Sequence, residues 1–357
     1  MKTLMKQIKL LAAAAFVMAP SMLFADTISP VSYTDTLAVG ESVTIRKTVV
    51  IEDAPASSAL LDVMFVFDVT GSMGGEIAAA KAAANGILAA LDADFDLQSG
   101  TGWYSDPGFN GVHVDLNSGN TAAASGINDM WGLGSCTVTG VGGVGCGGDF
   151  PEKGYAAISD AADNATWRAG SNRVIIALGD ATFKAPPSEA ATIASLAAAD
   201  ADLIGISYNS GFAADIAGLG GTSFAGGTSS ASVAAAIAAG ITSTFATYTE
   251  VTVDDLGGSG SGVGVSVACV SAAAGGSCSG ADAVGSWDRS ADRTFEFDVT
   301  FTGLEEGVHA FDTFALVDGG IVATEADLIT VAVPEPGSLL LLGMGLLGMG
   351  IRRRRAI

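Results

Sequence analysis

LDVMFVFDVTGSM, residues 61–73, is the stretch that decides the fold. Seven residues, 61–67, form a mainly apolar run, which is typical of a buried parallel strand. The segment after it carries Asp68, Thr70 and Ser72, one carboxylate and two hydroxyls at alternate positions. Side chains spaced in this way in a strand-to-helix loop can converge on one point. Because hard divalent cations prefer oxygen ligands, the stretch predicts a Mg²⁺ site at the rim of an α/β sheet.

Outward from this stretch, residues 61–248 alternate between strand and helix patterns. Helices are expected over 76–91, 155–167, 187–199 and 231–245, and strands over 173–180, 201–208 and 222–225, with weak strand signals at 95–97 and 112–116. Strands separated by helices predict a parallel sheet that is covered on both faces. The strand at 173–180 also ends in an acid, Asp180. Ligands of such sheets bind at the carboxyl ends of the strands, where Asp68 and Asp180 both fall.

Three segments together resemble the von Willebrand factor A (vWA) domain family. They are Asp68-Val69-Thr70-Gly71-Ser72, the loop Gly148-Asp149-Phe150-Pro151-Glu152, and Asp180-Ala181-Thr182-Phe183. The resemblance implies a Rossmann-like fold and a metal-ion-dependent adhesion site (MIDAS). It implies that the ion, Mg²⁺ or else Ca²⁺ or Mn²⁺, is held by Asp68, Thr70, Ser72, Glu152 and Asp180. The family's first motif has Ser where this chain has Thr70, which keeps the hydroxyl ligand.

The middle loop is most similar to the integrin β version of the domain, in which a Glu at the position of Glu152 contributes to the central ion. Asp149 and Glu76 are candidate ligands of secondary ions. Gly147 and Gly75 replace ligand residues of the flanking integrin sites, which weakens the case for further ions. The alternative is that Asp68, Ser72 and Asp180 only cap helices or lie in loops.

The flanks of this α/β region have β patterns. Residues 26–57 contain alternating apolar positions, and residues 249–332 include the strictly alternating RTFEFDVTF at 293–301. Thirty-two residues cannot bury a core alone. The economical arrangement is one β-sandwich built from both flanks, with the α/β domain at 58–248 inserted between them; a separate β-rich domain at 249–332 is the alternative.

Four cysteines form two close pairs, Cys136 with Cys146 and Cys269 with Cys278. In an exported chain these predict two local disulfides. A zinc site of four cysteines is the alternative, but the spacings do not match the usual C-x2-C knuckles.

Both ends of the chain carry sorting signals. Residues 1–25 have a basic start, an apolar centre and a small-residue cleavage site, so they predict a cleaved signal peptide rather than an N-terminal anchor. Residues 333–357 contain Pro334-Glu335-Pro336, a short apolar segment and an arginine cluster. This order resembles the PEP-CTERM sorting signal of Gram-negative bacteria. It implies transient anchoring in the inner membrane, processing by an exosortase, and delivery to the cell envelope, outer surface or extracellular matrix; a permanent tail anchor is the alternative.

Without both signals the chain has nine basic and 37 acidic residues, a net charge of −28. Such a charge excludes nucleic-acid partners and disfavours anionic membranes. No nucleophile-elbow, zinc-protease or Walker motif is present, so we do not expect an enzyme. We expect an exported, cation-dependent adhesion protein that binds an acidic group of a protein or polysaccharide partner. The alternative is a structural matrix protein, associated with exopolysaccharide, whose metal site only stabilises the fold.

Overall fold

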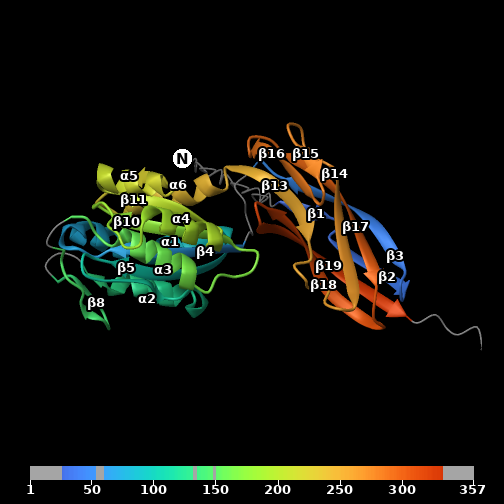
Figure 1. Cartoon of the computed structure of the whole chain (residues 1–357), viewed down its shortest axis with the longest axis horizontal. Coiled ribbons are helices and arrows are strands. Elements are labelled where there is room, and N and C mark those ends of the chain that lie inside the picture. The colour runs from blue at the N-terminus through green and yellow to red at the C-terminus, as the bar shows by residue number, and fades with distance from the viewer. Residues whose placement is uncertain (1–25, 54–59, 132–134, 148–149, 333–357) are drawn as a thin grey trace, which may run out of the picture.

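A six-stranded sheet forms the centre of one half of the molecule in the computed structural model, which describes residues 26–53, 60–131, 135–147 and 150–332 (Figure 1). Its strand order is β12-β11-β10-β4-β5-β6, and all neighbouring strands are parallel except β5 and β6, which are antiparallel. The strands are β4 (Leu60–Asp68), β5 (Asp96–Tyr104), β6 (Phe109–Val114), β10 (Asn172–Gly179), β11 (Ala201–Ser207) and β12 (Thr222–Ala225).

Helices cover both faces of this sheet, which confirms the predicted α/β class. On one face α1, α2 and α6 pack against Val63, Phe65 and Phe67 of β4; on the other, α3, α4 and α5 pack against Met64 and Val66. Both faces of β4 are therefore mainly apolar, as its mainly apolar run predicted. The helices are α1 (Gly74–Asp94), α2 (Asn120–Asp129), α3 (Gly154–Asn164), α4 (Glu189–Ala199), α5 (Ser210–Gly218) and α6 (Ser230–Thr244).

Four features of the α/β unit were not expected from the sequence: helix α2, helix α5, the full length of β5, and a small sheet of β7 (Met130–Trp131), β8 (Thr137–Val138) and β9 (Gly142–Gly143). β5 contains Gly100 and Gly102, which weaken a strand pattern. A side chain at Gly102 would meet the carbonyl oxygen of Gly111 in β6 at 2.2 Å. The glycine therefore permits a close backbone approach that the strand pattern alone does not reveal.

Two further sheets form a β-sandwich beside the α/β unit (Figure 1). One has the order β1-β3-β17-β14 and the other the order β15-β16-β13-β18-β19-β2. Their strands are β1 (Thr27–Ser29), β2 (Ser32–Ala38), β3 (Ser42–Ile51), β13 (Thr247–Asp254), β14 (Val263–Ser271), β15 (Ser277–Ser279), β16 (Asp282–Asp288), β17 (Arg293–Gly303), β18 (Gly307–Val317) and β19 (Gly320–Ala332).

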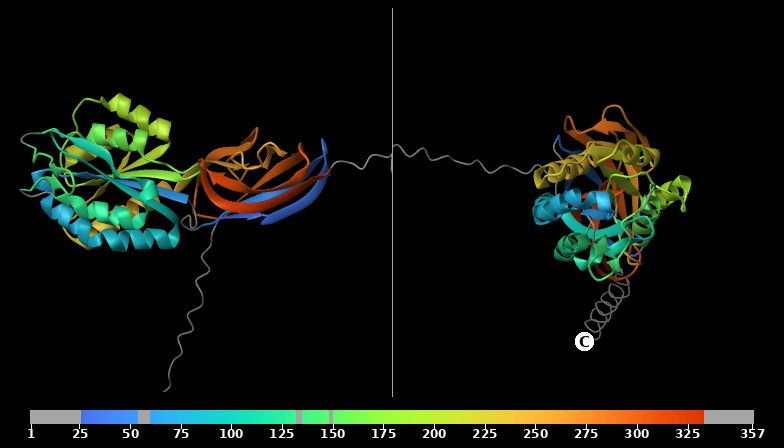
Figure 2. Two further views of the ribbon diagram at one scale, coloured as in Figure 1. Left: turned by 90° about the horizontal axis from the view of Figure 1, so that it is seen from below. Right: turned by 90° about the vertical axis from the view of Figure 1, so that its left-hand side faces the viewer.

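Both chain flanks contribute to this sandwich, as the blue and the orange-to-red strands in Figure 2 show. β3 pairs antiparallel with β17, and β2 pairs parallel with β19. The turn at Gly40, where φ is +81°, carries the chain from one sheet to the other instead of closing a hairpin. Alternate residues of β17 fill the interior between the sheets: Phe295, Phe297, Val299 and Phe301, all fully buried.

Arg289 joins the two halves of the molecule. Its side chain forms an ion pair with Asp26 (2.7 Å) and donates hydrogen bonds to the carbonyl oxygens of Phe245 (3.1 Å) and Glu52 (3.4 Å). Phe245 follows α6 and Glu52 follows β3, so one guanidinium lies at both connections between the sandwich and the α/β unit.

Each half contains one disulfide. Cys136 is bonded to Cys146 in the α/β half and Cys269 to Cys278 in the sandwich, which confirms the predicted pairs and excludes a shared zinc site. Within the described ranges, no helix has the length and apolar character needed to span a bilayer. The expected signal peptide (1–25) and C-terminal signal (333–357) lie outside these ranges.

Candidate metal centre

The candidate site begins where β4 ends. Asp68 is the last residue of the strand and is fully buried, and a 3-10 turn at Gly71–Met73 leads directly into α1. Thr70 is 3% exposed, whereas Ser72 is exposed to solvent. The loop thus runs from the interior to the surface within five residues.

Two hydrogen bonds and one close oxygen–oxygen contact connect this loop to Asp180. The Thr70 hydroxyl donates to Asp68 Oδ1 (2.7 Å), Thr70 Oγ1 lies 3.4 Å from Ser72 Oγ, and the Ser72 hydroxyl donates to Asp180 Oδ1 (3.0 Å). Asp180 directly follows β10, the neighbour of β4 in the sheet. Adjacent parallel strands therefore bring the two predicted acids to the same edge.

Glu152 reaches this edge through pairing of its loop with the segment after Asp180. Its backbone N–H donates to the carbonyl oxygen of Thr182 (2.7 Å), and its carbonyl oxygen accepts from the N–H of Lys184 (2.8 Å). The residue is 3% exposed.

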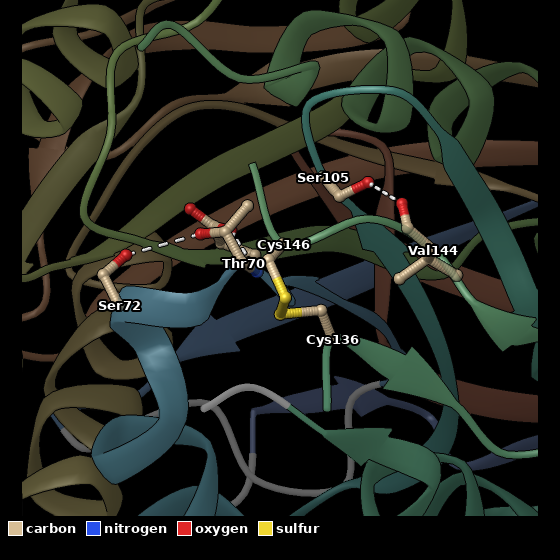
Figure 3. Close-up of a disulfide and its surroundings, with 7 residues drawn as sticks. Thr70, Ser72, Ser105, Cys136, Val144 and Cys146 are labelled. Atoms are coloured by element: carbon tan, nitrogen blue, oxygen red, sulfur yellow. Dashed lines mark hydrogen bonds between the residues drawn. A yellow bond between two sulfur atoms is a disulfide. The ribbon is translucent and has the colours of Figure 1, made fainter. Parts of the chain in front are cut away.

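The disulfide-linked segment packs against the loop at residues 68–72, which is called the metal loop after the ligands predicted in it (Figure 3). The carbonyl oxygen of Cys146 accepts a hydrogen bond from the N–H of Gly71 (3.0 Å), and the Ser105 hydroxyl donates to the carbonyl oxygen of Val144 (2.7 Å). The sequence did not predict this contact, because nothing in the spacing of the cysteines indicates which loop they face. The disulfide restrains the segment that supports Gly71.

Gly147, the next residue, permits a close approach of three segments. Its φ is +70°, and a side chain there would meet Glu152 Oε1 at 2.5 Å and the Thr70 methyl group at 3.2 Å. The glycine at this position therefore has a structural reason. A side chain at residue 147 would displace the carboxylate of Glu152.

Charge at the site is poorly compensated by the protein itself. Burial raises the pKa of Asp68 to about 7, and the charge of Asp180 adds to this, against the opposing effect of hydrogen bonds from Thr70 and from the backbone of Asp180. Burial also raises the pKa of Tyr104 well above its usual value, and the nearby Asp68, Asp180 and Glu152 add to this. Asp68 Oδ2 is buried and has no hydrogen-bond partner among the described residues. A buried carboxylate oxygen without a partner is costly unless a cation binds it.

Helix capping does not explain this arrangement. Thr70 is the N-cap of the 3-10 turn and Met73 that of α1, and neither forms a side-chain capping hydrogen bond. Asp68 Oδ1 instead accepts from the N–H and the hydroxyl of Thr70. Carboxylate and hydroxyl oxygens with one buried, unpartnered oxygen fit a hard divalent ion such as Mg²⁺, which Asp68, Thr70, Ser72 and Glu152 would hold, with Asp180 behind Ser72.

The candidate secondary ligands remain predictions. Asp149 lies outside the described residues. Glu76 is in the first turn of α1, where its charge stabilises the helix N-terminus. In the part of the chain that the structure describes, the one group of three acids with ligand oxygens all within 4.8 Å of one another is Glu52, Asp53 and Asp292, near the junction of the two halves. The acids of the metal loop are spaced more widely, with hydroxyls between them.

Comparisons with solved structures found matches of low overall similarity. A von Willebrand factor type A protein from Catenulispora acidiphila has 15% identity and a TM-score of 0.35, with 85% of this chain and 72% of that chain covered. Proximal thread matrix protein 1 from the mussel byssus has 15% identity and a TM-score of 0.37 (52% and 47% covered). The pilus adhesin SpaC from Lactobacillus rhamnosus GG, in its open conformation, has 12% identity and a TM-score of 0.35 (82% and 45% covered). The chain thus spans less than half of the last two.

The chain ends in a recognisable sorting motif. No curated protein matches the chain significantly in sequence. Residues 332–355 match the family model described as the PEP-CTERM protein-sorting motif. The motif implies export to the cell envelope of a Gram-negative-type bacterium and exosortase-type processing.

Proposed function

We propose that this protein is an exported binding protein that holds a divalent cation, Mg²⁺ in the first instance, at the edge of its α/β sheet and uses it to grip an acidic group of a partner. The observation that carries the proposal is the buried Asp68 Oδ2, which lacks a hydrogen-bond partner in the described structure. The hydroxyls of Thr70 and Ser72 and the carboxylates of Asp180 and Glu152 lie around it. A bound cation would supply the missing positive charge.

The exposure of the site favours an adhesive rather than a purely structural ion. Asp68, Thr70 and Glu152 are buried, but Ser72 is exposed and Asp180 is half-buried. An ion held mainly by buried ligands in this way has a coordination position on the solvent side. A carboxylate of a partner is a suitable ligand for that position.

Exposed apolar side chains occur on two segments that are connected to the site. They belong to the loop before Glu152 and to the small sheet of β7 (Met130–Trp131), β8 (Thr137–Val138) and β9 (Gly142–Gly143), and they are Phe150 (66% exposed), Val141 (51%) and Trp131 (50%). β8 lies at the end of the α/β unit remote from the sandwich (Figure 1). Exposed apolar groups beside a charged site are typical of an interaction surface. The sandwich would then connect this surface to the C-terminal motif.

The direct test is cation binding by the exported protein. Mn²⁺, which can be followed by electron paramagnetic resonance, should bind the natural protein and should bind Asp68→Asn much more weakly. Asp94→Asn is the matched control, since Asp94 is exposed at the end of α1. Equal binding by Asp68→Asn and the control would contradict the metal site.

Adhesion is tested with a defined acidic polymer and with native partners. Protein bound to alginate beads, and partners captured from envelope and matrix extracts, should be compared in Mg²⁺ and in EDTA. Thr70→Ala keeps the net charge, so non-specific bridging by Mg²⁺ is unchanged in it. Binding that is lost in both EDTA and Thr70→Ala supports the adhesive function. Mn²⁺ binding without any cation-dependent capture would favour the structural role instead.

A further inference from the structure

A lysine and two acids are buried together inside the sandwich. Lys47 of β3 and Glu325 of β19 are both 0% exposed, and Asp327 of β19 is 3% exposed. Lys47 Nζ lies 2.5 Å from Glu325 Oε2 and 3.6 Å from Asp327 Oδ1. Because β3 and β19 belong to different sheets, the three groups meet between the two layers.

The surroundings of this cluster are apolar, and its polar atoms are not all satisfied. Lys47 Nζ lies 5.2 Å from the centre of the Phe301 ring. Thr313 of β18, also fully buried, donates a hydrogen bond to Asp327 Oδ2. Glu325 Oε1 and Asp327 Oδ1 have no hydrogen-bond partner among the described residues. Packed apolar side chains of similar volume would commonly be as stable as such an ion pair or more so, so stability alone does not account for the cluster.

Burial has a chemical consequence for both acids. It raises the pKa of Glu325 and that of Asp327, in each case against the effect of Lys47, and the contact between the two carboxyl groups raises the pKa of Glu325 further and lowers that of Asp327. A protonated carboxyl group beside an amine, in a site closed to bulk solvent, is a potential acyl donor. The sandwich interior also excludes bulk water, which would otherwise solvate the two groups and favour hydrolysis of the amide over its formation.

We propose that Lys47 and Asp327 form an intramolecular amide bond, with Glu325 as the group that transfers the proton. Glu325 first accepts one proton from the ammonium group of Lys47 and passes it to the Asp327 carboxylate. The neutral Nζ then attacks Cγ of the protonated Asp327 carboxyl, and Glu325 accepts the second proton that Nζ loses. The tetrahedral intermediate then expels the Asp327 hydroxyl, which receives a proton from Glu325 and leaves as water. One N–C bond forms, one C–O bond breaks, one water is released, and no oxidant or cofactor is required.

The geometry assigns different roles to the two acids. Glu325 is the acid in hydrogen-bond contact with Nζ, which suits proton transfer. Asp327 lies in van der Waals contact with Nζ, and its other oxygen accepts from Thr313. A hydroxyl donor on that oxygen stabilises the negative charge that develops on it during attack.

The bond would join the two flanks of the chain across the inserted α/β unit. Lys47 precedes the insertion, and Asp327 lies five residues before the start of the sorting motif at residue 332. Tension applied from the C-terminal end of the chain reaches β19 first. A covalent link from β19 to β3 would pass this load to the opposite sheet, so the strand could not be pulled out of the sandwich. This inference does not depend on the metal site.

The experiment is tryptic mapping of the exported, reduced full-length protein. Trypsin does not cut after an acylated lysine, so Lys47 and Asp327 should appear in one branched peptide, lighter than the sum of its parts by one water. Asp327→Ala and Glu325→Gln should each yield the separate peptides, and Glu296→Gln, an exposed neighbour on β17, should retain the link. Separate peptides in the natural protein would overturn the proposal whatever the variants do. A link to Glu325 would overturn the assignment of the two acids.

Discussion

Two sets of buried acids in this molecule differ in the source of the positive charge that balances them. At the sheet edge, Asp68 has hydroxyl neighbours and a buried oxygen that no described residue contacts. In the sandwich, Glu325 and Asp327 have the ammonium group of Lys47 between the sheets. The first set opens to solvent at Ser72, whereas the second is sealed. A sealed acidic cluster must contain its own cation, while an open one can take its cation from the medium.

The largest effect on stability is expected from removing Lys47, the cation inside the sandwich. Lys47→Met removes both the ammonium group that balances the two buried acids and the amide link that we propose it forms, and it should lower the free energy of unfolding by about 3–5 kcal/mol or more. Arg46→Met is the matched control, because Arg46 is the adjacent residue and forms exposed ion pairs with Asp298 and Glu296. Its cost should be about 0–1 kcal/mol. Denaturant titration measures both, and equal costs would mean that the cluster is not held by Lys47.

The two disulfides provide the next comparison, because their cysteines are 10 and 9 positions apart. Replacing either pair by serine should cost about 2–4 kcal/mol in stability. Only the Cys136→Ser/Cys146→Ser variant should also weaken Mn²⁺ binding, since the carbonyl oxygen of Cys146 supports Gly71. If the Cys269→Ser/Cys278→Ser variant weakened it equally, the effect would not be local to the metal loop.

Addition of Mg²⁺ tests directly whether the site at Asp68 takes a cation from the medium. At a concentration about 100 times the dissociation constant, Mg²⁺ should stabilise the α/β half by about 2.7 kcal/mol. Asp68→Asn should abolish this gain. In EDTA the same variant should melt no lower than the natural protein, because it removes a buried charge that lacks compensation. Thermal melting with and without EDTA measures both effects, and a variant that melts lower in EDTA would show that Asp68 is compensated by the protein.

The smallest effect on stability is expected at Gly147, where the backbone lies close to the side chains of Glu152 and Thr70. Gly147→Ala and Gly140→Ala introduce a side chain at φ values of +70° and +83°, so each should cost about 1 kcal/mol in stability. A side chain at Gly140 meets nothing within 4 Å, whereas one at Gly147 meets Glu152 Oε1. Only Gly147→Ala should therefore weaken Mn²⁺ binding, by about 10-fold. Calorimetric titration of the two variants decides whether the position of Glu152 matters.

The sequence predicted the elements of the α/β unit whose patterns are local. The apolar run before Asp68 and the strand before Asp180 are found within a residue of their expected ends, and β12 coincides with its prediction. Helices α2 and α5 were missed. α2 contains Gly126, and α5 is only nine residues long, so neither has a strong helical pattern over enough residues.

Composition and motif spacing alone determined that the chain is acidic, carries a sorting motif, and presents oxygen ligands after two buried strands. The sequence could not determine that Cys146 faces Gly71, why residue 147 is glycine, or that Lys47 meets Glu325 and Asp327. Lys47 and Glu325 are 278 positions apart, and no local pattern specifies which strands of two sheets face each other. Those contacts depend on tertiary packing, because only the burial of β3 and β19 against each other brings these charged residues together.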